Sequence, residues 1–245
     1  MTILILGATS AIAQAYARRR AGEGARFVLA GRREDRLAAI AADLVACGAA
    51  AAEPLVVDLA AIDGIEETAR ALRARFGEPD EALIAYGSLG EQAVSERDLH
   101  AARAMFDTNF TSAALWSLAL LKYRPPMAPF TLVAIGSVAG DRGRASNFIY
   151  GSAKAALDRL LEGLAQKYDG SPVRIITIKP GFVDTPMTAG IPKGGRLWAT
   201  PDQVAADIAR AVAKGRRVMY TPWFWRPIML IIRHLPWFVF KRLKI

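Results

Sequence analysis

Cysteine and histidine are scarce in this chain, and their scarcity already narrows what it can be. The 245 residues contain one cysteine, Cys47, and two histidines. A single cysteine cannot form an internal disulfide, which is consistent with a reducing compartment, and we expect no metal site. Cys47 lies near the end of an alanine-rich helical stretch, 36–48, where we expect a buried structural thiol rather than a nucleophile.

Long apolar runs and a secretory leader are also missing. No uninterrupted apolar run reaches the roughly 18 residues that a membrane-spanning helix needs. The opening MTILILGATS has no basic segment before its apolar residues, so it predicts a first strand rather than a signal peptide. We therefore expect a cytoplasmic protein without a spanning helix.

Acidic residues are the minority among the charged ones, at 23 against 32 lysines and arginines, for a formal net charge of +9. Five basic residues and no acidic one fall within 222–245. This concentration favours an anionic surface or substrate near the C-terminus over a nucleic-acid groove. With 53% hydrophobic and 22% charged residues, the chain suits one α/β domain with a large core.

Short apolar segments alternate with helical stretches along the chain. We predict strands at 3–6, 26–30, 54–58, 82–86, 130–136, 173–179 and 217–221. We predict helices at 11–21, 34–47, 62–76, 95–122, 150–168 and 201–214. Strands without polar alternation, each followed by a helix, are typical of a parallel sheet covered on both faces. The fold class is therefore α/β, a doubly wound Rossmann-type sheet of about seven strands over 1–221, with a C-terminal tail over 222–245.

The turn after the first strand has features of a pyrophosphate site. Free backbone N–H groups and the positive end of a helix dipole suit an anion there. The candidate contacts are Gly7, Thr9, Ser10, Ala11 and Ile12. Only Gly7 remains of the usual glycine fingerprint, and Ala11 costs about 1 kcal/mol if its backbone needs a positive φ. Alone, this motif fits a structural strand–helix turn equally well.

The second and third strands end in residues that would select the nucleotide. Arg32 and Arg33 stand where a site specific for NAD would hold a carboxylate. Arginine suits a 2′-phosphate, so we favour NADP(H) over NAD(H), with Arg32 the better candidate. The alternative is that both arginines are merely solvated at a helix start. Asp58 closes the third strand, where its carboxylate serves either the adenine amino group or a helix cap.

A tyrosine and a lysine four residues apart form the catalytic candidate. Tyr150 and Lys154 would lie on one helix face, about one turn apart. A nearby ammonium lowers the pKa of a phenol, and such a phenol can donate a proton to a carbonyl oxygen. The spacing alone also describes an ordinary helix pair. Ser137, at the end of a strand, and Asn109, a poor helix former, favour a ligand site.

These residues, in this order and at these separations, make the chain resemble the short-chain dehydrogenase/reductase family over 2–221. The resemblance implies that Tyr150 is the general acid/base and that Lys154 lowers its pKa and binds the nicotinamide ribose. It implies that Ser137 orients the carbonyl and that Asn109 holds a water in a proton relay. Further implied cofactor contacts are Leu59, Tyr86, Gly87, Pro180, Gly181, Val183 and Thr185. The expected activity is NAD(P)-dependent reduction of a ketone.

Segments at 85–90, 145–154 and 225–236 make the resemblance narrower. They resemble family members that reduce a polyprenylphosphate-linked 2-keto pentofuranose and work with a flavin oxidase in cell wall biosynthesis. The alternatives are another apolar ketone, such as a 3-oxoacyl or steroid-like substrate, and a catalytically silent nucleotide-binding membrane module. Candidate substrate contacts are Arg142 and Arg144, which would meet a phosphate, and Phe148.

The tail combines three tryptophans, three phenylalanines and five basic residues within 223–245. This composition suits a segment lying in the membrane interface, and the alternative is a helix packed on the domain or on a partner subunit. We therefore expect a protein peripheral to the inner face of the cytoplasmic membrane. The resemblance also implies a homodimer or homotetramer that uses the predicted helices 95–122 and 150–168.

Overall fold

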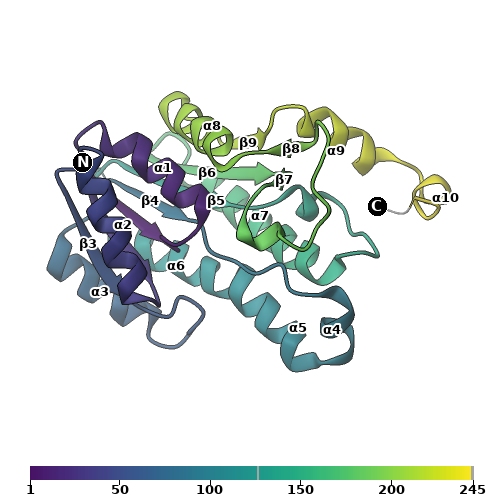
Figure 1. Cartoon of the computed structure of the whole chain (residues 1–245), viewed down its shortest axis with the longest axis horizontal. Coiled ribbons are helices and arrows are strands. Elements are labelled where there is room, and N and C mark those ends of the chain that lie inside the picture. The colour runs from purple at the N-terminus through teal and green to yellow at the C-terminus, as the bar shows by residue number, and fades with distance from the viewer. Residues whose placement is uncertain (126, 244–245) are drawn as a thin grey trace.

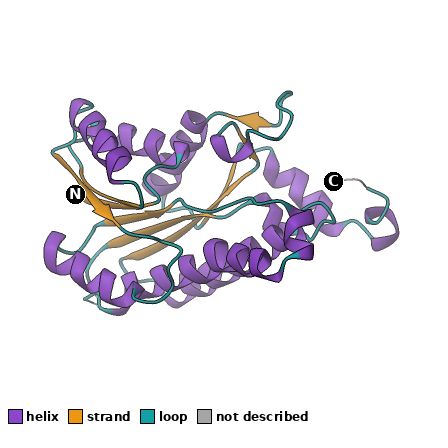
Figure 2. Ribbon diagram, turned by 60° about the horizontal axis from the view of Figure 1, so that its bottom comes forward, coloured by secondary structure: helices purple, strands orange, loops and turns teal. Residues whose placement is uncertain are grey.

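The predicted apolar segments form one parallel sheet, shown in Figures 1 and 2. The computed structural model describes residues 1–125 and 127–243, and its main sheet has the strand order β3-β2-β1-β4-β5-β6-β9. The strands are β1 (Thr2–Leu6), β2 (Arg26–Gly31), β3 (Ala51–Val56), β4 (Glu81–Ile84), β5 (Phe130–Ile135), β6 (Val173–Pro180) and β9 (Val218–Thr221). All neighbouring strands are parallel. The predicted doubly wound sheet is confirmed.

Helices cover both faces of this sheet, as Figure 2 shows. Side chains alternate along each strand, so β1 sends Ile3 and Ile5 into one apolar cluster and Leu4 and Leu6 into the other. The first cluster is closed by α1 (Ala11–Ala21), α2 (Glu34–Ala46) and α8 (Pro201–Lys214). The second is closed by α3 (Ile65–Phe76), α6 (Ser112–Lys122) and α7 (Phe148–Lys167).

The main difference from prediction concerns the helix expected at 95–122. It is divided into α4 (Gln92–Arg97), α5 (Leu99–Phe106), the π-helical turn η1 (Asp107–Thr111) and α6. Asp98 separates the first two, because its backbone is extended and its carboxylate accepts a hydrogen bond from the His100 N–H at 2.8 Å. The π-helical turn contains Asn109, and such turns often occur at functional sites.

Three smaller expectations also differ from the structure. β3 ends at Val56, so Asp58 follows the strand rather than closing it. Two strands of two residues each, β7 (Phe182–Val183) and β8 (Trp198–Ala199), pair in a small separate sheet and are too short to leave a periodic pattern. The expectation of a buried thiol is wrong, because Cys47 lies exposed directly after α2.

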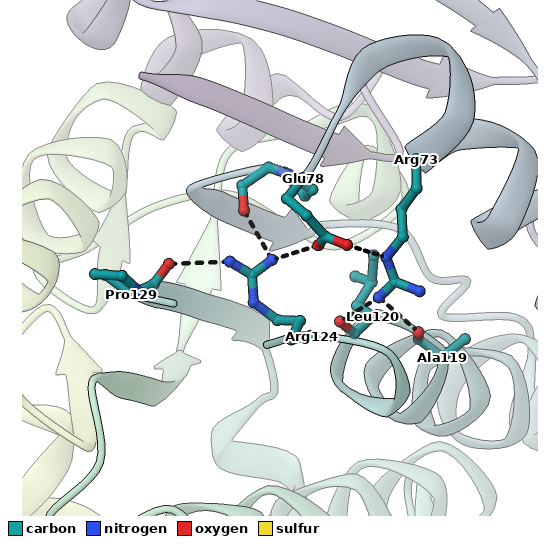
Figure 3. A network of polar contacts seen from close by, with 7 residues as sticks. Arg73, Glu78, Ala119, Leu120, Arg124 and Pro129 are labelled. Carbon is teal, nitrogen blue, oxygen red and sulfur yellow. Dashed lines mark hydrogen bonds and ion pairs between the residues drawn. The ribbon is translucent and has the colours of Figure 1, made fainter. Parts of the chain in front are cut away.

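At the amino ends of β4 and β5, two arginines share one carboxylate (Figure 3). Arg73 Nε lies 2.7 Å from Glu78, and Arg124 Nη1 lies 3.0 Å from the same side chain. Arg73 also donates to the carbonyls of Ala119 and Leu120 in α6. This network ties the helix ends to one edge of the sheet, and the candidate catalytic residues lie at the opposite edge.

The tail packs against the domain through one face. α9 (Trp225–His234) buries Trp225 and Met229 against Val138, and α10 (Trp237–Phe240) follows it. Figure 1 shows both helices beyond β9 at one end of the molecule. Within 1–125 and 127–243, no helix is both long enough and apolar enough to cross a membrane.

Candidate active site

The strand order reverses between β1 and β4, which places the expected ligand crevice at the carboxyl ends of these strands. Gly7 directly follows β1 and has a φ of +91°. A Cβ atom there would lie 2.8 Å from both the Cβ and the backbone N of Tyr86. Only glycine therefore fits this turn. Tyr86 is itself fixed, because its Oη lies 2.7 Å from Ser112 Oγ.

The first turn of α1 can bind an anion through its free backbone N–H groups and the positive end of the helix dipole. Its N-cap, Ser10, makes no side-chain cap, and the turn holds no acidic residue. Ala11 is the first helical residue, and every described residue with positive φ is a glycine, so the expected strain at Ala11 is absent. Thr9 is exposed beside the turn, whereas the Ile12 side chain is buried. The Gly7 turn and this helix end therefore fit a dinucleotide pyrophosphate.

The two arginines after β2 differ in their partners. Arg33 Nη2 lies 3.1 Å from Asp35, and both side chains are exposed. Arg33 also begins α2 as its N-cap, and the first turn of that helix carries two acidic residues. Arg32 is exposed and makes no ion pair with any residue that the structure describes. Of the two, Arg32 is therefore the cation available to an anionic ligand.

The residues after β3 close a local turn. Asp58 is exposed, and its Oδ1 accepts a hydrogen bond from the Ala60 N–H at 3.0 Å. Since α3 begins only at Ile65, Asp58 does not cap that helix. The Leu59 side chain is buried, and its carbonyl accepts a hydrogen bond from Ser112 Oγ. Both residues lie at the same sheet edge as Gly7, and their contact with adenine stays a prediction.

Asn109 is buried in η1, where its amide holds the segment after β4. Its Nδ2 donates to the carbonyls of Ser88 at 2.9 Å and Met105 at 3.0 Å, and its Oδ1 accepts from the Ser88 N–H at 3.2 Å. A Cβ on Gly87 would lie 2.7 Å from Asn109 Oδ1 and 3.6 Å from Lys154 Nζ. Gly87 thus lets Asn109 and Lys154 approach one another. The water relay implied for Asn109 stays a prediction.

Ser137, Tyr150 and Lys154 come together at the carboxyl end of β5. Ser137 Oγ caps the short helix η2 (Val138–Asp141) by accepting from the Ala139 N–H at 3.1 Å, and it also hydrogen-bonds Tyr150. Lys154 is 4% exposed, and its Nζ donates to the Ile135 carbonyl at 3.0 Å. The same Nζ lies 5.8 Å from the centroid of the Tyr150 ring. The predicted catalytic group is therefore assembled in one place.

Burial controls the titration of the tyrosine and the lysine. It raises the pKa of Tyr150 to about 12, against the opposing effect of the Ser137 hydrogen bond. It lowers the pKa of Lys154 to about 8, against the opposing charge of Asp158. We expected Lys154 to lower the pKa of Tyr150, but burial raises it instead. At neutral pH Tyr150 is a neutral phenol, and Lys154 is largely protonated.

Trp225 of the tail reaches the carboxyl end of β6. A Cβ on Gly181 would lie 1.9 Å from its Nε1, so only glycine admits the indole. Phe182 stacks on Trp198 with ring centroids 5.3 Å apart, and it meets Trp225 edge-on at 5.7 Å. Val138, the neighbour of Ser137, packs on the same indole. We call Phe182, Trp198 and Trp225 the aromatic wall; it borders the catalytic residues.

The other predicted members of this loop are placed around the wall. Pro180 ends β6, and the Gly181 N–H donates to the Thr221 carbonyl at 3.0 Å. Val183 is buried in β7, so only its backbone remains for a cofactor. Thr185 begins the short helix η3 (Pro186–Thr188) in a capping box. Their contacts with nicotinamide stay a prediction.

Arg142 serves the tail rather than a substrate. Its Nη1 donates to the carbonyls of Ile232, Arg233 (3.2 Å) and Leu235 (2.8 Å) at the carboxyl end of α9. Its guanidinium lies 3.8 Å from the centroid of the Phe240 ring. These bonds satisfy carbonyls that the helix leaves without partners. We therefore correct the expectation that Arg142 meets a substrate phosphate.

Arg144 and Phe148 remain as candidate substrate contacts. Arg144 is half-buried, burial lowers the pKa of its guanidinium, and its Nε has no hydrogen-bond partner among the described residues. Phe148 is the first residue of α7 and is 43% exposed. A cation and a ring therefore flank the segment that leads into Tyr150.

Sequence reasoning missed two buried charged residues behind the site. Asp158 and Lys179 are each 5% exposed, and Lys179 Nζ lies 2.7 Å from an Asp158 carboxylate oxygen. Signals for both were present. Asp158 extends the four-residue spacing of Tyr150 and Lys154 by one more helical turn, and Lys179 is a charged residue that follows the apolar run Ile175–Ile178 with its single threonine.

Known proteins share this architecture. A solved short-chain dehydrogenase from Sphingobium yanoikuyae in complex with NADPH has a TM-score of 0.80 at 23% identity, covering 96% of each chain. A 3-oxoacyl-[acyl-carrier protein] reductase from Brucella melitensis in complex with NAD has a TM-score of 0.79 at 22% identity, covering 91% of this chain and 96% of that one. At these identities the likeness concerns the fold.

Sequence relatives are closer. An uncharacterized oxidoreductase of Mycobacterium tuberculosis is 39% identical over 241 residues, covering 98% of this chain and 96% of the relative. One from Streptomyces coelicolor is 39% identical over 249 residues, covering 100% and 96%. The family model described as short chain dehydrogenase matches residues 1–195. The chain therefore belongs to the short-chain dehydrogenase family and is a nicotinamide-dependent oxidoreductase.

Proposed function

We propose that this chain is an NADPH-dependent reductase of a lipid-carried ketone, most specifically a polyprenylphosphate-linked 2-keto pentofuranose. The observation that carries the proposal is the position of the tail. Trp225 packs on Gly181 beside the catalytic residues, and the outer face of α9 exposes the apolar side chains of Leu230 and Ile231. A substrate with an apolar chain would meet this surface as it leaves the catalytic centre.

The catalytic residues suit reduction. A nicotinamide dinucleotide supplies the hydride when bound, and the Gly7 turn and the α1 N-terminus would hold its pyrophosphate. The Ser137 hydroxyl orients the substrate carbonyl, and the neutral Tyr150 phenol gives its proton to that oxygen as the alcohol forms. Lys154 keeps a positive charge near the phenol, which stabilises the negative charge left when the proton moves.

A matched pair of variants tests the nucleotide preference. We expect Arg32→Ala to raise the Kd for NADPH by about tenfold or more, because a charge-assisted contact with the 2′-phosphate is lost. The Kd for NADH, which lacks that phosphate, changes little. Arg36→Ala, which removes an exposed arginine of α2, is the control. Equal losses for both nucleotides, measured by quenching of protein fluorescence, would contradict the preference for NADPH.

The tail also supports a membrane-facing role. Its most exposed large apolar side chains, which we call the tail surface, are Trp223, Leu230, Ile231, Trp237 and Phe238. Exposed basic residues accompany them, namely Arg226, Arg233, Lys241 and Arg242. Aromatic and aliphatic groups beside cations suit the interface of an anionic bilayer, to which the polyprenyl chain of the proposed substrate also belongs.

Vesicle binding tests this surface. We expect the protein to sediment with vesicles containing phosphatidylglycerol, less so at high salt, and little with phosphatidylcholine alone. The double variant Ile231→Ser/Phe238→Ser should bind about tenfold or more weakly, since it removes two large apolar side chains from the interface. Leu99→Ser, at an 81% exposed position on α5, is the control. Equal binding by all three proteins would favour a tail that only packs on the domain.

The substrate is tested by direct competition. NADPH oxidation is measured with a polyprenylphosphate-linked keto-arabinofuranose, with a 3-oxoacyl thioester and with a steroid ketone. We expect the highest kcat/KM with the lipid-linked sugar. Efficient turnover of the thioester or the steroid without the sugar lipid would leave the reductase chemistry in place and move the substrate to that class.

A further inference from the structure

Four buried charges lie behind the active site and come from three different segments. They are Asp141 of η2, Lys154 and Asp158 of α7, and Lys179 of β6, and we call them the buried cluster. Lys154, Asp158 and Lys179 are at most 5% exposed, and the Asp141 side chain is 2% exposed. Their two positive and two negative formal charges balance. Balance matters here, because an uncompensated charge at this depth is strongly unfavourable.

Asp158 lies directly beneath the loop that carries Ser137. That residue is flanked by Gly136 and, three residues later, by Gly140. A Cβ on Gly136 would lie 2.7 Å from Asp158 Oδ1, and one on Gly140 would lie 3.0 Å from Oδ2. The absence of side chains at these two positions therefore lets the loop close over the carboxylate. Asp158 is therefore in close contact with the loop that carries Ser137.

Asp158 also stands one helical turn beyond Lys154. The spacing i,i+4 places the two side chains on the same face of α7. Lys154 Nζ has a hydrogen bond to the Ile135 carbonyl, which carries no charge. The Asp158 carboxylate is the charged group whose effect opposes burial and raises the pKa of Lys154. Asp158 is thus a carboxylate on the same helix face whose charge acts on the active-site lysine.

The remaining members hold Asp158 from the other side. Lys179 Nζ lies 2.7 Å from Asp158 and also bonds Asp141. Asp141 accepts a second hydrogen bond from Tyr220 Oη of β9 at 2.8 Å. Lys179 immediately precedes Pro180 at the end of β6. The buried cluster therefore joins the Ser137 loop, the catalytic helix and the two strands that lead to the aromatic wall and the tail.

We propose that Asp158 is a positioning residue, which supports the Ser137 loop from beneath and keeps the Lys154 ammonium charged beside the reacting groups. Burial raises the pKa of Asp158, and the ion pair with Lys179 opposes that shift. Lys179 also pairs with Asp141. The inference rests on the proposed role of Lys154, and it does not depend on which ketone is reduced.

The test follows the titration of Lys154 itself. Protein labelled with ¹³C-lysine is titrated by NMR, and the Lys154 Cε signal is assigned by its loss in Lys154→Met. We expect a midpoint near pH 8 in the unaltered chain. In Asp158→Asn the midpoint falls by about one pH unit, because the opposing charge of Asp158 is gone. The groups that face this site from α7, η2, β6 and β9 are Tyr150, Asp158, Asp141, Lys179 and Tyr220.

Asp158→Asn keeps the Lys179–Asp141 ion pair, so one buried ion pair remains. Asp158→Ala is the second variant should the asparagine amide disturb folding, and the same downward shift is expected. Asp207→Asn is the control, since this buried aspartate on α8 pairs with Arg210 and Thr221 instead. An unchanged Lys154 midpoint in a folded Asp158 variant overturns the proposal. Because no substrate is added, that result is independent of the reductase assay.

Discussion

Replacing Tyr150 by phenylalanine should reduce the rate of ketone reduction by about 10²- to 10⁴-fold, the range attributed to general acid catalysis. The variant removes the hydroxyl that Ser137 contacts and keeps the ring. Since burial holds the phenol neutral, the lost group is a proton donor, and no charged partner of the nucleotide disappears with it. We therefore expect kcat to fall while the Kd for NADPH stays within a factor of about three.

Tyr168→Phe is the matched control for this experiment. Tyr168 directly follows the same helix α7 at its other end, and its ring packs against the apolar cluster that α3, α6 and α7 close. The control should retain turnover and nucleotide affinity. Stopped-flow measurement of NADPH oxidation separates the chemical step from product release. A Tyr150→Phe protein with turnover close to that of the control would remove Tyr150 from the role of proton donor.

The fold could be predicted from the sequence where local signals, such as caps and turn residues, agree with the pattern of buried apolar residues. The helix Pro201–Lys214 has the predicted bounds, because Thr200 and Gln203 form a capping box, proline occupies the first turn, and Gly215 ends the helix with a left-handed backbone. The strands of the sheet are apolar on both faces, and that pattern alone predicts helices above and below it. The catalytic residues were found for a related reason, since their positions at strand ends and helix starts are local features.

Properties that depend on tertiary contacts could not be predicted from the sequence. Nothing near Arg142 in the sequence indicates that its guanidinium caps a helix some ninety residues later in the chain. The direction of the Tyr150 shift is set by burial, which follows from packing rather than from the lysine four residues away. The buried cluster is assembled from segments that are remote in sequence. The helix break at Asp98 is different, because aspartate is a common N-cap residue and the sequence therefore contained a local signal for it.

Gly7→Ala should have a large effect on both the stability of the chain and its affinity for the nucleotide. The added Cβ meets the backbone N and the Cβ of Tyr86 at 2.8 Å, and the φ of +91° is unfavourable for any residue with a side chain. Backbone strain and overpacking together should lower the free energy of unfolding by roughly 2–4 kcal/mol. The turn must also shift to relieve the overlap, so we expect nucleotide affinity to fall by about tenfold or more.

Gly170→Ala is the control that separates backbone strain from the steric overlap with Tyr86. Gly170 has a similar φ of +77°, but its added Cβ would meet nothing within 4 Å, and it lies before β6 at the opposite edge of the sheet. It should therefore lose only about 1 kcal/mol of stability and keep full nucleotide affinity. Urea titration gives the unfolding free energies, and fluorescence titration with NADPH gives the affinities. If both variants lost the same stability and both bound NADPH normally, the contact between Gly7 and Tyr86 would have no part in shaping the nucleotide site.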